Sequence, residues 1–393
     1  MSLFSLASAI GWVLVVLVAG LVRGRPYVYF SGVLLGIYSL VAVSLAPQMG
    51  SLLPVYAYLH ASVYASFVFL ARPRMRPTWF RVLVSWPGSW FLGSTLLAFP
   101  WAIAAACGLR PLGFFVPYVV ALLGFADTFL PRRETVHVVV GEPGHVALAR
   151  GPSRKGQDPR PLRIVQITDP HLGPFMSVDR LRRICERTVA LKPDLVMLTG
   201  DFLTMESQSD HALLGRALAP LQALEGRCFA CFGNHDHEAP EHVRAGLASA
   251  KVVLLMDEMR RVETAAGPVE ILGFDFRWRD RSAHLEEVTS RHPRDGDVVR
   301  IGLLHDPGAF RHLPAGSADL VLSGHTHGGQ LGLLWMGLPQ TILSALSRIP
   351  DHGLWSRGKD RLYIHRGTGH YGFPLRLGVP PEESVLELHR ASA

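Results

Sequence analysis

The sequence predicts a layered α/β sandwich preceded by an all-α transmembrane domain. Two observations predict this arrangement. The first third of the chain is a series of apolar stretches, and beyond it short β-branched runs alternate with segments of helical periodicity. We therefore divide the chain into a transmembrane helical anchor domain at residues 1–133, a linker at 134–161 and an α/β domain at 162–393.

The N-terminal third contains apolar stretches that are long enough to cross a bilayer. Each has about 20 residues, which is the helical length needed to cross ~30 Å of hydrocarbon. Together they predict about five transmembrane spans. The stretches are 4–22, 27–46, 52–71, 89–107 and 112–130.

The distribution of arginine predicts the orientation of these spans. If there are five, eight arginines fall on one side of the membrane and only Arg110 falls on the other. The eight are Arg23, Arg25, Arg72, Arg74, Arg76, Arg81, Arg132 and Arg133. Because basic residues collect on the cytoplasmic side, the chain is predicted to be a multi-pass protein of the inner (cell) membrane whose α/β domain faces the cytoplasm.

The net charge of +7 belongs almost wholly to the N-terminal third, which carries nine Arg, no Lys and one acidic residue, Asp127. The remainder has 30 basic and 31 acidic residues. The positive charge therefore indicates a membrane bilayer as partner, and no nucleic acid. Four cysteines are too few for a disulfide framework, and Cys228 and Cys231 are expected to be core residues on opposite faces of a strand.

The linker is predicted to begin with a strand-like run, TVHVVV, in a short hairpin and to continue as an exposed connector. From Leu162 onward, strand-like runs alternate with three predicted helices. Val178–Leu191 ends before Lys192-Pro193, as a helix should. The other two predicted helices are His211–Leu224 and Glu241–Ser249.

Clusters of Asp, Asn and His follow five of the predicted strands, RIVQIT, DLVMLT, CFACF, VVRIGLL and ADLVLS. If these strands share one sheet, their ends bring the polar side chains to a common point. The most specific cluster is His325-Thr326-His327, because residues i and i+2 of an extended segment share a face. Oxygen ligands mixed with imidazoles suit a pair of divalent ions such as Mn, Fe or Zn. The sequence therefore predicts a two-metal hydrolase site.

The order of these clusters, D-x-H, GD, GNHD, a lone His and GHxH, resembles the calcineurin-like metallophosphoesterase superfamily. The resemblance runs from about Leu162 to the C-terminus. HTHGGQ and GTGHYGFPLRLGVPPEESVLEL resemble the membrane-anchored bacterial subgroup that includes UDP-2,3-diacylglucosamine pyrophosphatases. Two residues depart from the pattern: Pro170 stands where Leu is more usual, and His370 stands where a smaller residue is expected.

The resemblance implies a complete set of metal ligands. Asp169, His171 and His327 would hold the first ion, Asn234, His305 and His325 would hold the second, and Asp201 would bridge the two. Two divalent ions, Mn²⁺ in the first place, would activate a shared water and neutralise phosphate charge. His235 is the expected catalytic residue and would protonate or stabilise the leaving oxygen. Asp236 would orient His235 or one of the ligands.

The leading functional hypothesis is a membrane-anchored phosphoesterase acting on a lipid-linked phosphate or diphosphate. The specific candidate is hydrolysis of UDP-2,3-diacylglucosamine to UMP and a lipid-sugar 1-phosphate. An alternative is a metallophosphatase or phosphodiesterase acting on a soluble nucleotide, phosphoprotein or cell-wall precursor. A non-catalytic receptor ranks last, because all seven ligand positions and His235 are present. The sequence does not indicate an oligomeric state.

Two further expectations concern residues outside this set. The apolar run Leu331–Leu346 could be a core helix, but Pro339 favours a lid that dips into the membrane interface. Three histidines flank the expected substrate loops and are candidates for substrate contact: His352, His365 and His370. Six histidines are expected at the surface: His211, His242, His284, His292, His312 and His389.

Overall fold

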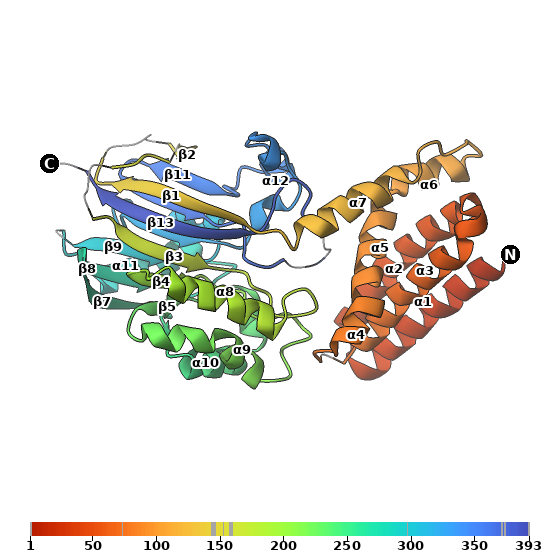
Figure 1. Cartoon of the computed structure of the whole chain (residues 1–393), viewed down its shortest axis with the longest axis horizontal. Helices are drawn as coiled ribbons and strands as arrows, with labels where there is room; N and C mark the ends of the chain where they lie inside the picture. Colours follow the sequence, from red (N-terminus) through yellow and green to blue (C-terminus); the bar gives the residue numbers. More distant parts are fainter. Residues whose placement is uncertain are drawn as a thin grey trace.

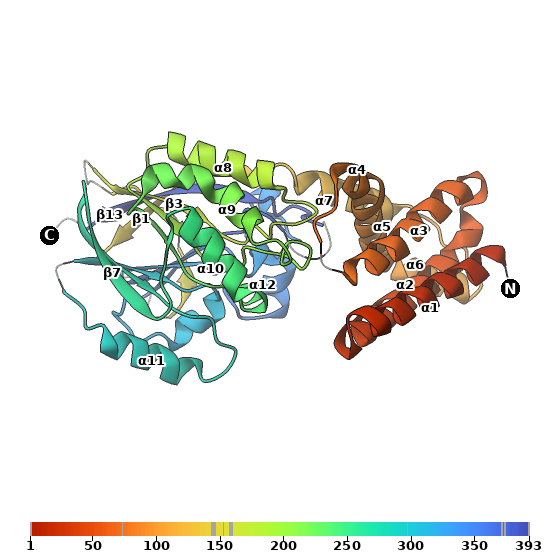
Figure 2. The same cartoon turned by 90° about the horizontal axis from the view of Figure 1, so that it is seen from below.

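The computed structural model describes residues 2–72, 74–142, 147–151, 153–156, 160–296, 298–370, 372 and 375–391. Figures 1 and 2 show a bundle of helices from the N-terminal third beside an α/β body from the rest of the chain. Part of the predicted linker lies outside the described residues. The division of the chain at residue 133 stays a prediction.

The described residues of the N-terminal third are mainly helical. Its helices are α1 (Leu3–Val22), α2 (Arg25–Leu45), α3 (Leu53–Leu70), α4 (Thr78–Phe80), α5 (Trp86–Leu97), α6 (Phe99–Ala106) and α7 (Val116–Asp127). Among the described residues, three helices are long and apolar enough to cross a membrane: Leu3–Val22, Arg25–Gln48 and Gly50–Leu70. A fourth span is possible only if the bent pair Thr78–Leu97 and Phe99–Ala106 acts as one. The predicted count of about five spans is not confirmed.

Proline residues explain why the last two predicted spans, 89–107 and 112–130, are not single long helices. The predicted stretch 89–107 bends by 58° between α5 and α6, where Pro100 lies in the first turn of α6 and cannot continue the preceding helix. The predicted stretch 112–130 is helical only from Val116 to Asp127, with Pro117 in its first turn. Its 12 residues span only about 18 Å, less than the ~30 Å of a hydrocarbon core.

The α/β body contains two sheets, and the predicted sandwich is confirmed. The six-stranded sheet has the order β1-β13-β3-β4-β5-β6. Its strands are β1 (Arg132–Val140), β13 (Glu382–Arg390), β3 (Leu162–Ile167), β4 (Leu195–Leu198), β5 (Cys228–Ala230) and β6 (Val253–Leu254). The seven-stranded sheet has the order β2-β11-β12-β10-β9-β8-β7. Its strands are β2 (Ala149–Arg150), β11 (Gly353–Arg357), β12 (Asp360–Ile364), β10 (Leu320–Ser323), β9 (Val299–Leu303), β8 (Gly267–Gly273) and β7 (Glu258–Thr264).

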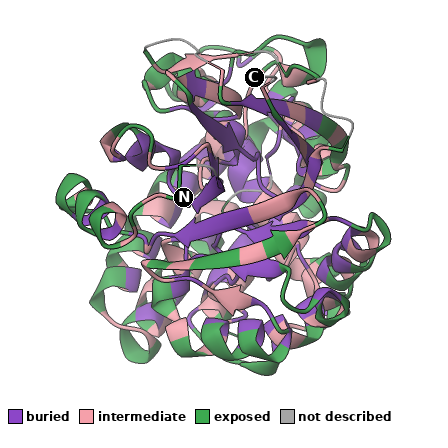
Figure 3. Ribbon diagram, turned by 90° about the vertical axis from the view of Figure 1, so that its left-hand side faces the viewer, coloured by how far each residue is buried: buried purple, intermediate pink, exposed green. Residues whose placement is uncertain are grey.

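Helices cover the outer faces of both sheets. The six-stranded sheet is covered over β3, β4 and β5 by α8 (Val178–Ala190), α9 (Ala212–Leu218) and α10 (Pro240–Ser249), and α11 (Arg281–Arg291) packs on the other sheet. A second core lies between the two sheets. In Figure 3 the strands are largely buried and the helices keep an exposed face. Cys228 and Cys231 belong to different cores, which confirms that they face opposite sides of the sheet.

The predicted hairpin at the start of the linker is wrong. β1 pairs in parallel with β13, the last strand, and β2 pairs with β11 in the other sheet. A parallel partner from the far end of the chain cannot be inferred from local turn signals. The segment that leaves the helical bundle is therefore an edge strand of the α/β body.

The apolar run at Leu331–Leu346 does not form a core helix. It contains a single turn at Leu334–Met336 and the short helix α12 (Ile342–Leu346). Its large side chains are exposed, with Trp335 and Met336 both at 63% and Leu346 at 80%. In Figure 1, α12 lies at the end of the α/β body that faces the helical bundle.

Candidate metal centre

The predicted ligands follow the carboxyl ends of five strands. Asp169 and His171 follow β3, Asp201 follows β4, and Asn234 follows β5 in the first sheet, while His305 follows β9 and His325 and His327 follow β10 in the second. The sandwich brings both sets of strand ends to one edge. Five of these residues have positive φ values of 44° to 68°: Asp169, His171, Asp201, His325 and His327. Such strained conformations in non-glycine residues concentrate at functional sites.

The first group consists of Asp169, His171 and His327, whose side-chain donor atoms lie within 4.8 Å of one another. The Nε2 atoms of the two histidines are 3.2 Å apart, and Nε2 of His327 lies 3.4 Å from Oδ1 of Asp169. All three residues are buried. The structure thus brings together the three residues predicted to hold the first ion.

The second group consists of Asp201, His305 and His325, again within 4.8 Å of one another. Oδ2 of Asp201 lies 3.3 Å from Nε2 of His305 and 3.7 Å from Nε2 of His171, which belongs to the first group. Asp201 therefore stands between the two groups, where the resemblance expects a bridging carboxylate.

Asn234, the remaining predicted ligand of the second ion, offers a suitable donor atom. Its Oδ1 is buried and has no hydrogen-bond partner among the described residues. A buried carbonyl oxygen without a partner is unfavourable by about 1–3 kcal/mol, and binding to a metal ion would remove that penalty. The donor set therefore fits a pair of divalent ions.

Burial favours the neutral form that a metal needs in three of the four predicted imidazole ligands. It lowers the pKa of His171 to about 3 and that of His325 to about 4, and it lowers the pKa of His327 well below its usual value. In His305, burial opposes protonation, but Asp201 outweighs it and raises the pKa to about 10, so this imidazole would have to lose a proton to bind an ion. Burial opposes ionisation of Asp201 as well, but His305 outweighs it and holds the pKa of this carboxyl low. Neutral imidazoles beside an ionised carboxylate are the forms that bind a metal ion.

His235 lies next to the first group, and Glu238 holds it in place. Its ring packs edge-on against His171 with centroids 5.5 Å apart, and its Nδ1 lies 2.7 Å from Oε1 of Glu238. Burial opposes protonation of His235, but the hydrogen bond to Glu238 outweighs it and raises the pKa of the imidazole. Glu238 was not among the predicted site residues, although it follows His235 at the i+3 spacing of a helical turn.

Asp236 does not contact His235 in the way Glu238 does. Its Oδ2 accepts hydrogen bonds from the backbone N–H groups of Asp201 and Gly233, at 2.7 and 2.8 Å, and its Oδ1 accepts one from Phe202. Of the two predicted roles, the geometry favours support of a ligand, because Asp236 fixes the backbone of Asp201.

Thr199 and Arg376 fix the imidazoles of two predicted ligands, His305 and His327. Nδ1 of His305 donates to the backbone oxygen of Thr199 at 2.5 Å, which directs Nε2 towards Asp201. Arg376, fully buried, places Nη2 2.9 Å from Nδ1 of His327 and donates to the backbone oxygen of Gly369. Such outer contacts fix ring orientation and tune metal affinity. Sequence reasoning missed Arg376, although it lies in the C-terminal stretch on which the resemblance drew.

Two of the six histidines expected at the surface are buried. His284 and His389 are buried, so the expectation that they lie at the surface is wrong. His284 is held by Asp257 at 2.8 Å, and His389 lies on the outer face of β13. Of the three candidates for substrate contact, His370 is buried against the ring of Phe175, with centroids 4.4 Å apart.

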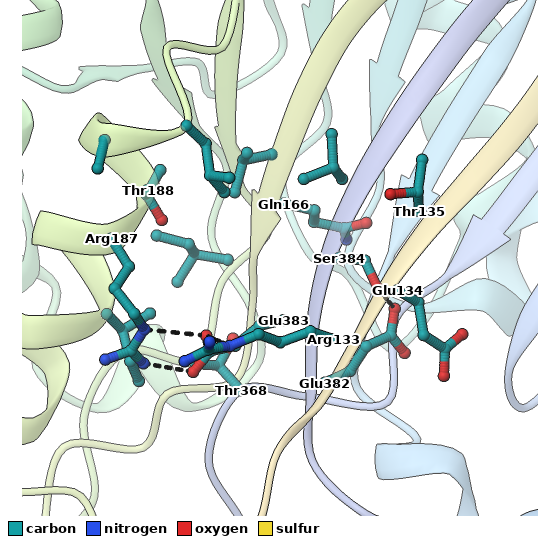
Figure 4. Close-up of a pocket in the computed structure, with 16 residues that line it drawn as sticks. Arg133, Glu134, Thr135, Gln166, Arg187, Thr188, Thr368, Glu382, Glu383 and Ser384 are labelled. Carbon is teal, nitrogen blue, oxygen red and sulfur yellow. Dashed lines mark hydrogen bonds and ion pairs between the residues drawn. The ribbon is translucent and has the colours of Figure 1, made fainter.

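A cavity of about 430 Å³ lies beside α8 and the strands β1, β3 and β13. Val165, Ile167 and Ile184 contribute apolar walls. Figure 4 shows dashed contacts from Arg187 to Glu383, and Arg133 also pairs with Glu383, at 3.2 Å. None of the predicted metal ligands lines this cavity, so the metal centre is formed by the strand-end loops and not by this space.

A two-sheet α/β fold with paired Asp/His groups at its strand ends defines a metal-dependent hydrolase. The family model for calcineurin-like phosphoesterases matches residues 162–329. Metallophosphoesterase YkoQ of Bacillus subtilis is 31% identical over 240 residues, which cover 58% of this chain and 83% of the relative. The chain therefore belongs to the calcineurin-like metallophosphoesterases, and membership implies divalent metal ions.

Two further relatives carry more specific names. Phosphodiesterase YaeI of Escherichia coli is 28% identical over 233 residues, covering 58% of this chain and 82% of the relative. UDP-2,3-diacylglucosamine pyrophosphatase LpxG of Chlamydia muridarum is 27% identical over 276 residues, covering 57% of this chain and 83% of the relative. The relatives thus include both a phosphodiesterase and a lipid-sugar pyrophosphatase.

Proposed function

We propose that the chain is a membrane-anchored two-metal phosphoesterase that hydrolyses a lipid-linked phosphate or diphosphate at the cytoplasmic surface of the inner membrane. UDP-2,3-diacylglucosamine is the specific candidate, with UMP and a lipid-sugar 1-phosphate as products. The relationship to LpxG supports the nucleotide sugar by analogy, since one fold serves many substrates.

The observation that carries the proposal is a short series of contacts that joins the predicted metal centre to the helical bundle. The side chain of Arg376 contacts the predicted ligand His327, and its backbone N–H donates to the oxygen of Gly124 in α7 at 3.1 Å. Beside it, Phe175 packs against His370 and against Trp86 and Phe125 of the bundle. A phosphate attached to a lipid therefore has little distance to travel from a bilayer around the bundle to the metals.

The positions of the arginines support a cytoplasmic α/β domain. Arg23 follows α1 and places Nη2 3.0 Å from Sδ of Met205 in the α/β body. Arg133 follows α7 and pairs with Glu383 of β13 at 3.2 Å. These basic residues thus lie on the same side of the bundle as the catalytic domain, as expected if that side is cytoplasmic.

The exposed apolar segment at Leu331–Leu346 supports a substrate that keeps acyl chains in the membrane. Its backbone is joined to the loop beside α7, since the N–H of Trp335 donates to the oxygen of Gly378 at 3.2 Å. The N–H of Gly378 in turn donates to Asp127 at the end of α7. An exposed apolar patch beside a membrane anchor is typical of a membrane-binding surface.

The predicted ligands would bind two metal ions, one at each group. Asp169, His171 and His327 would hold one ion; Asn234, His305 and His325 would hold the other, with Asp201 between them. Mn²⁺ is the first choice for both, and the pair would supply an activated water and charge neutralisation at phosphate. His235 would protonate the leaving oxygen, and Glu238 would fix the orientation of its ring.

The test is release of UMP from UDP-2,3-diacylglucosamine in mixed micelles by detergent-purified, Mn-loaded protein, with a soluble aryl phosphodiester and the Asp201→Asn variant alongside. We expect the lipid to be turned over far faster than the aryl ester and the variant to be inactive. Turnover of the aryl ester alone would keep the hydrolase and reject the lipid substrate. Absence of turnover of either compound by metal-loaded protein would reject the proposed catalysis.

The lipid assignment has a second test. Trp335→Ser should lower turnover of the micellar lipid by an order of magnitude or so, because burial of a large apolar side chain is worth about 1.5–3 kcal/mol. Turnover of the soluble aryl ester should not change, since Trp335 is not among the predicted ligands. Equal loss on both substrates would show that the segment supports the fold and does not bind lipid.

A further inference from the structure

A second cluster of side chains that could hold a metal ion lies on the outer face of the edge strand β1 and its neighbour β13. His137 of β1 stands directly opposite Glu387 of β13, and His389 lies two residues further along β13 on the same face. The opposite face of these strands is filled by Val136, Val138, Leu386 and Leu388, which belong to the core between the sheets. The cluster is therefore held by two rigid, paired strands.

The cluster is separate from the catalytic centre. Glu387 pairs with Arg163 near the amino end of β3, whereas Asp169 follows the carboxyl end of the same strand. Six residues of extended chain correspond to about 20 Å. The two sites therefore lie at opposite ends of the sheet.

The distances within the cluster match those between the ligands of a tetrahedral ion. Nδ1 of His137 lies 3.3 Å from Oε2 of Glu387 and 3.4 Å from Nε2 of His389. All three donor atoms lie within 4.8 Å of one another. Tetrahedral bonds of about 2.0–2.1 Å place ligand atoms about 3.3 Å apart. The predicted catalytic groups show similar spacings, 3.2 and 3.4 Å in the first of them.

The surroundings also suit an ion. The other carboxylate oxygen of Glu387, Oε1, lies 3.8 Å from Nε of Arg163, which leaves Oε2 directed towards His137. Segment 153–156 packs over the cluster: Ser153 bonds to the backbone of His137, and a Cβ on Gly156 would lie 2.4 Å from Cβ of His389. The side chains of His137 and Glu387 keep 26% and 23% of their surface exposed, so an ion could enter from solvent.

The geometry points to a Zn²⁺-binding site formed by His137, Glu387 and His389. Two imidazoles and one carboxylate form a donor set that Zn²⁺ accepts, with water as the fourth ligand. The ion would clamp β1, which leaves the helical bundle, to β13, the last strand of the catalytic domain. It would thereby strengthen the joint between anchor and enzyme. This inference does not depend on the substrate.

The test uses the full-length protein in detergent, stripped of metal and reloaded with Co²⁺ or Zn²⁺. We expect His137→Ala and Glu387→Gln each to lose one metal equivalent by mass spectrometry and to lose the visible absorption of four-coordinate Co²⁺. Both should keep the catalytic metals. Addition of Zn²⁺ should raise the unfolding temperature of the wild type by more than it raises that of either variant. His211→Ala, at an exposed histidine far from the cluster in sequence, is the matched control and should behave as the wild type.

Equal metal content and an identical Co²⁺ spectrum in wild type and both variants would overturn the inference and leave a simple His–Glu contact. His389 is buried, so its replacement could impair folding. The test therefore relies on the two partly exposed positions. Phosphodiester turnover is measured only to show that each variant is folded.

Discussion

Replacement of Arg376 is the sharpest test of how the metal centre is supported. Arg376→Met keeps much of the side-chain volume but removes the hydrogen bonds to His327 and to the oxygen of Gly369. Loss of a residue that orients a metal ligand typically lowers metal affinity or activity 10–100-fold, or about 1.4–2.7 kcal/mol. The two buried acceptors left without a donor should cost about 1–3 kcal/mol each in stability.

The assay is Mn²⁺ affinity by competition with a chelating dye, together with turnover of a phosphodiester and thermal unfolding. Arg361→Met is the matched control, because this buried arginine donates to backbone oxygens of Val139 and Glu142 and lies away from the predicted ligands. It should lower stability but not Mn²⁺ affinity. Wild-type affinity and turnover in folded Arg376→Met protein would refute the reasoning.

Two further predictions concern the ligands and the core. Asp201→Asn should weaken binding of both metals, whereas His327→Ala should weaken mainly one. The metal content of each variant is measured by mass spectrometry. Full retention of two metals in both variants would contradict the assignment. Burial opposes ionisation of Glu382, but His365 and Arg366 outweigh it and lower its pKa from 4.5 to about 2. Because the folded pKa is depressed, the stability that Glu382 contributes should be complete above about pH 4.5 and be lost as the pH falls towards 2. Glu382→Gln should lower the unfolding free energy by about 3–5 kcal/mol, since Arg366 would remain buried without its full counter-charge; an unchanged urea midpoint at pH 7 would argue against this.

The elements that sequence reasoning located correctly are those with a local signal. Val178–Leu191 carries helical periodicity and an N-cap serine, and the helix runs from Val178 to Ala190. The run before Asp169 is apolar and β-branched apart from Arg163 and Gln166, the run before His325 is apolar from Leu320 to Leu322, and both are strands. The predicted count of about five membrane spans is not confirmed, because it rested on apolar composition alone. Apolar composition does not register where a proline stops or bends a helix, as Pro100 does.

Residues that act through distant neighbours escaped prediction. Arg376 is 49 positions from His327, and His389 is 252 positions from His137. Neither distance leaves a periodic pattern in the sequence. Glu238 was closer to recognition, since it is three residues from His235, but only the short turn of the chain there brings the two side chains together.

The sequence by itself determined the type and order of the predicted metal ligands, because each follows a strand whose apolar pattern is local. It also determined that the N-terminal third is apolar and rich in arginine. Only the tertiary structure showed that the predicted ligands gather in two groups with donor atoms within 4.8 Å, that Arg376 contacts His327 and that β1 joins β13. These depend on pairing between segments far apart in the chain, and the free energy of such pairing is set by the packed sandwich as a whole and not by any one segment.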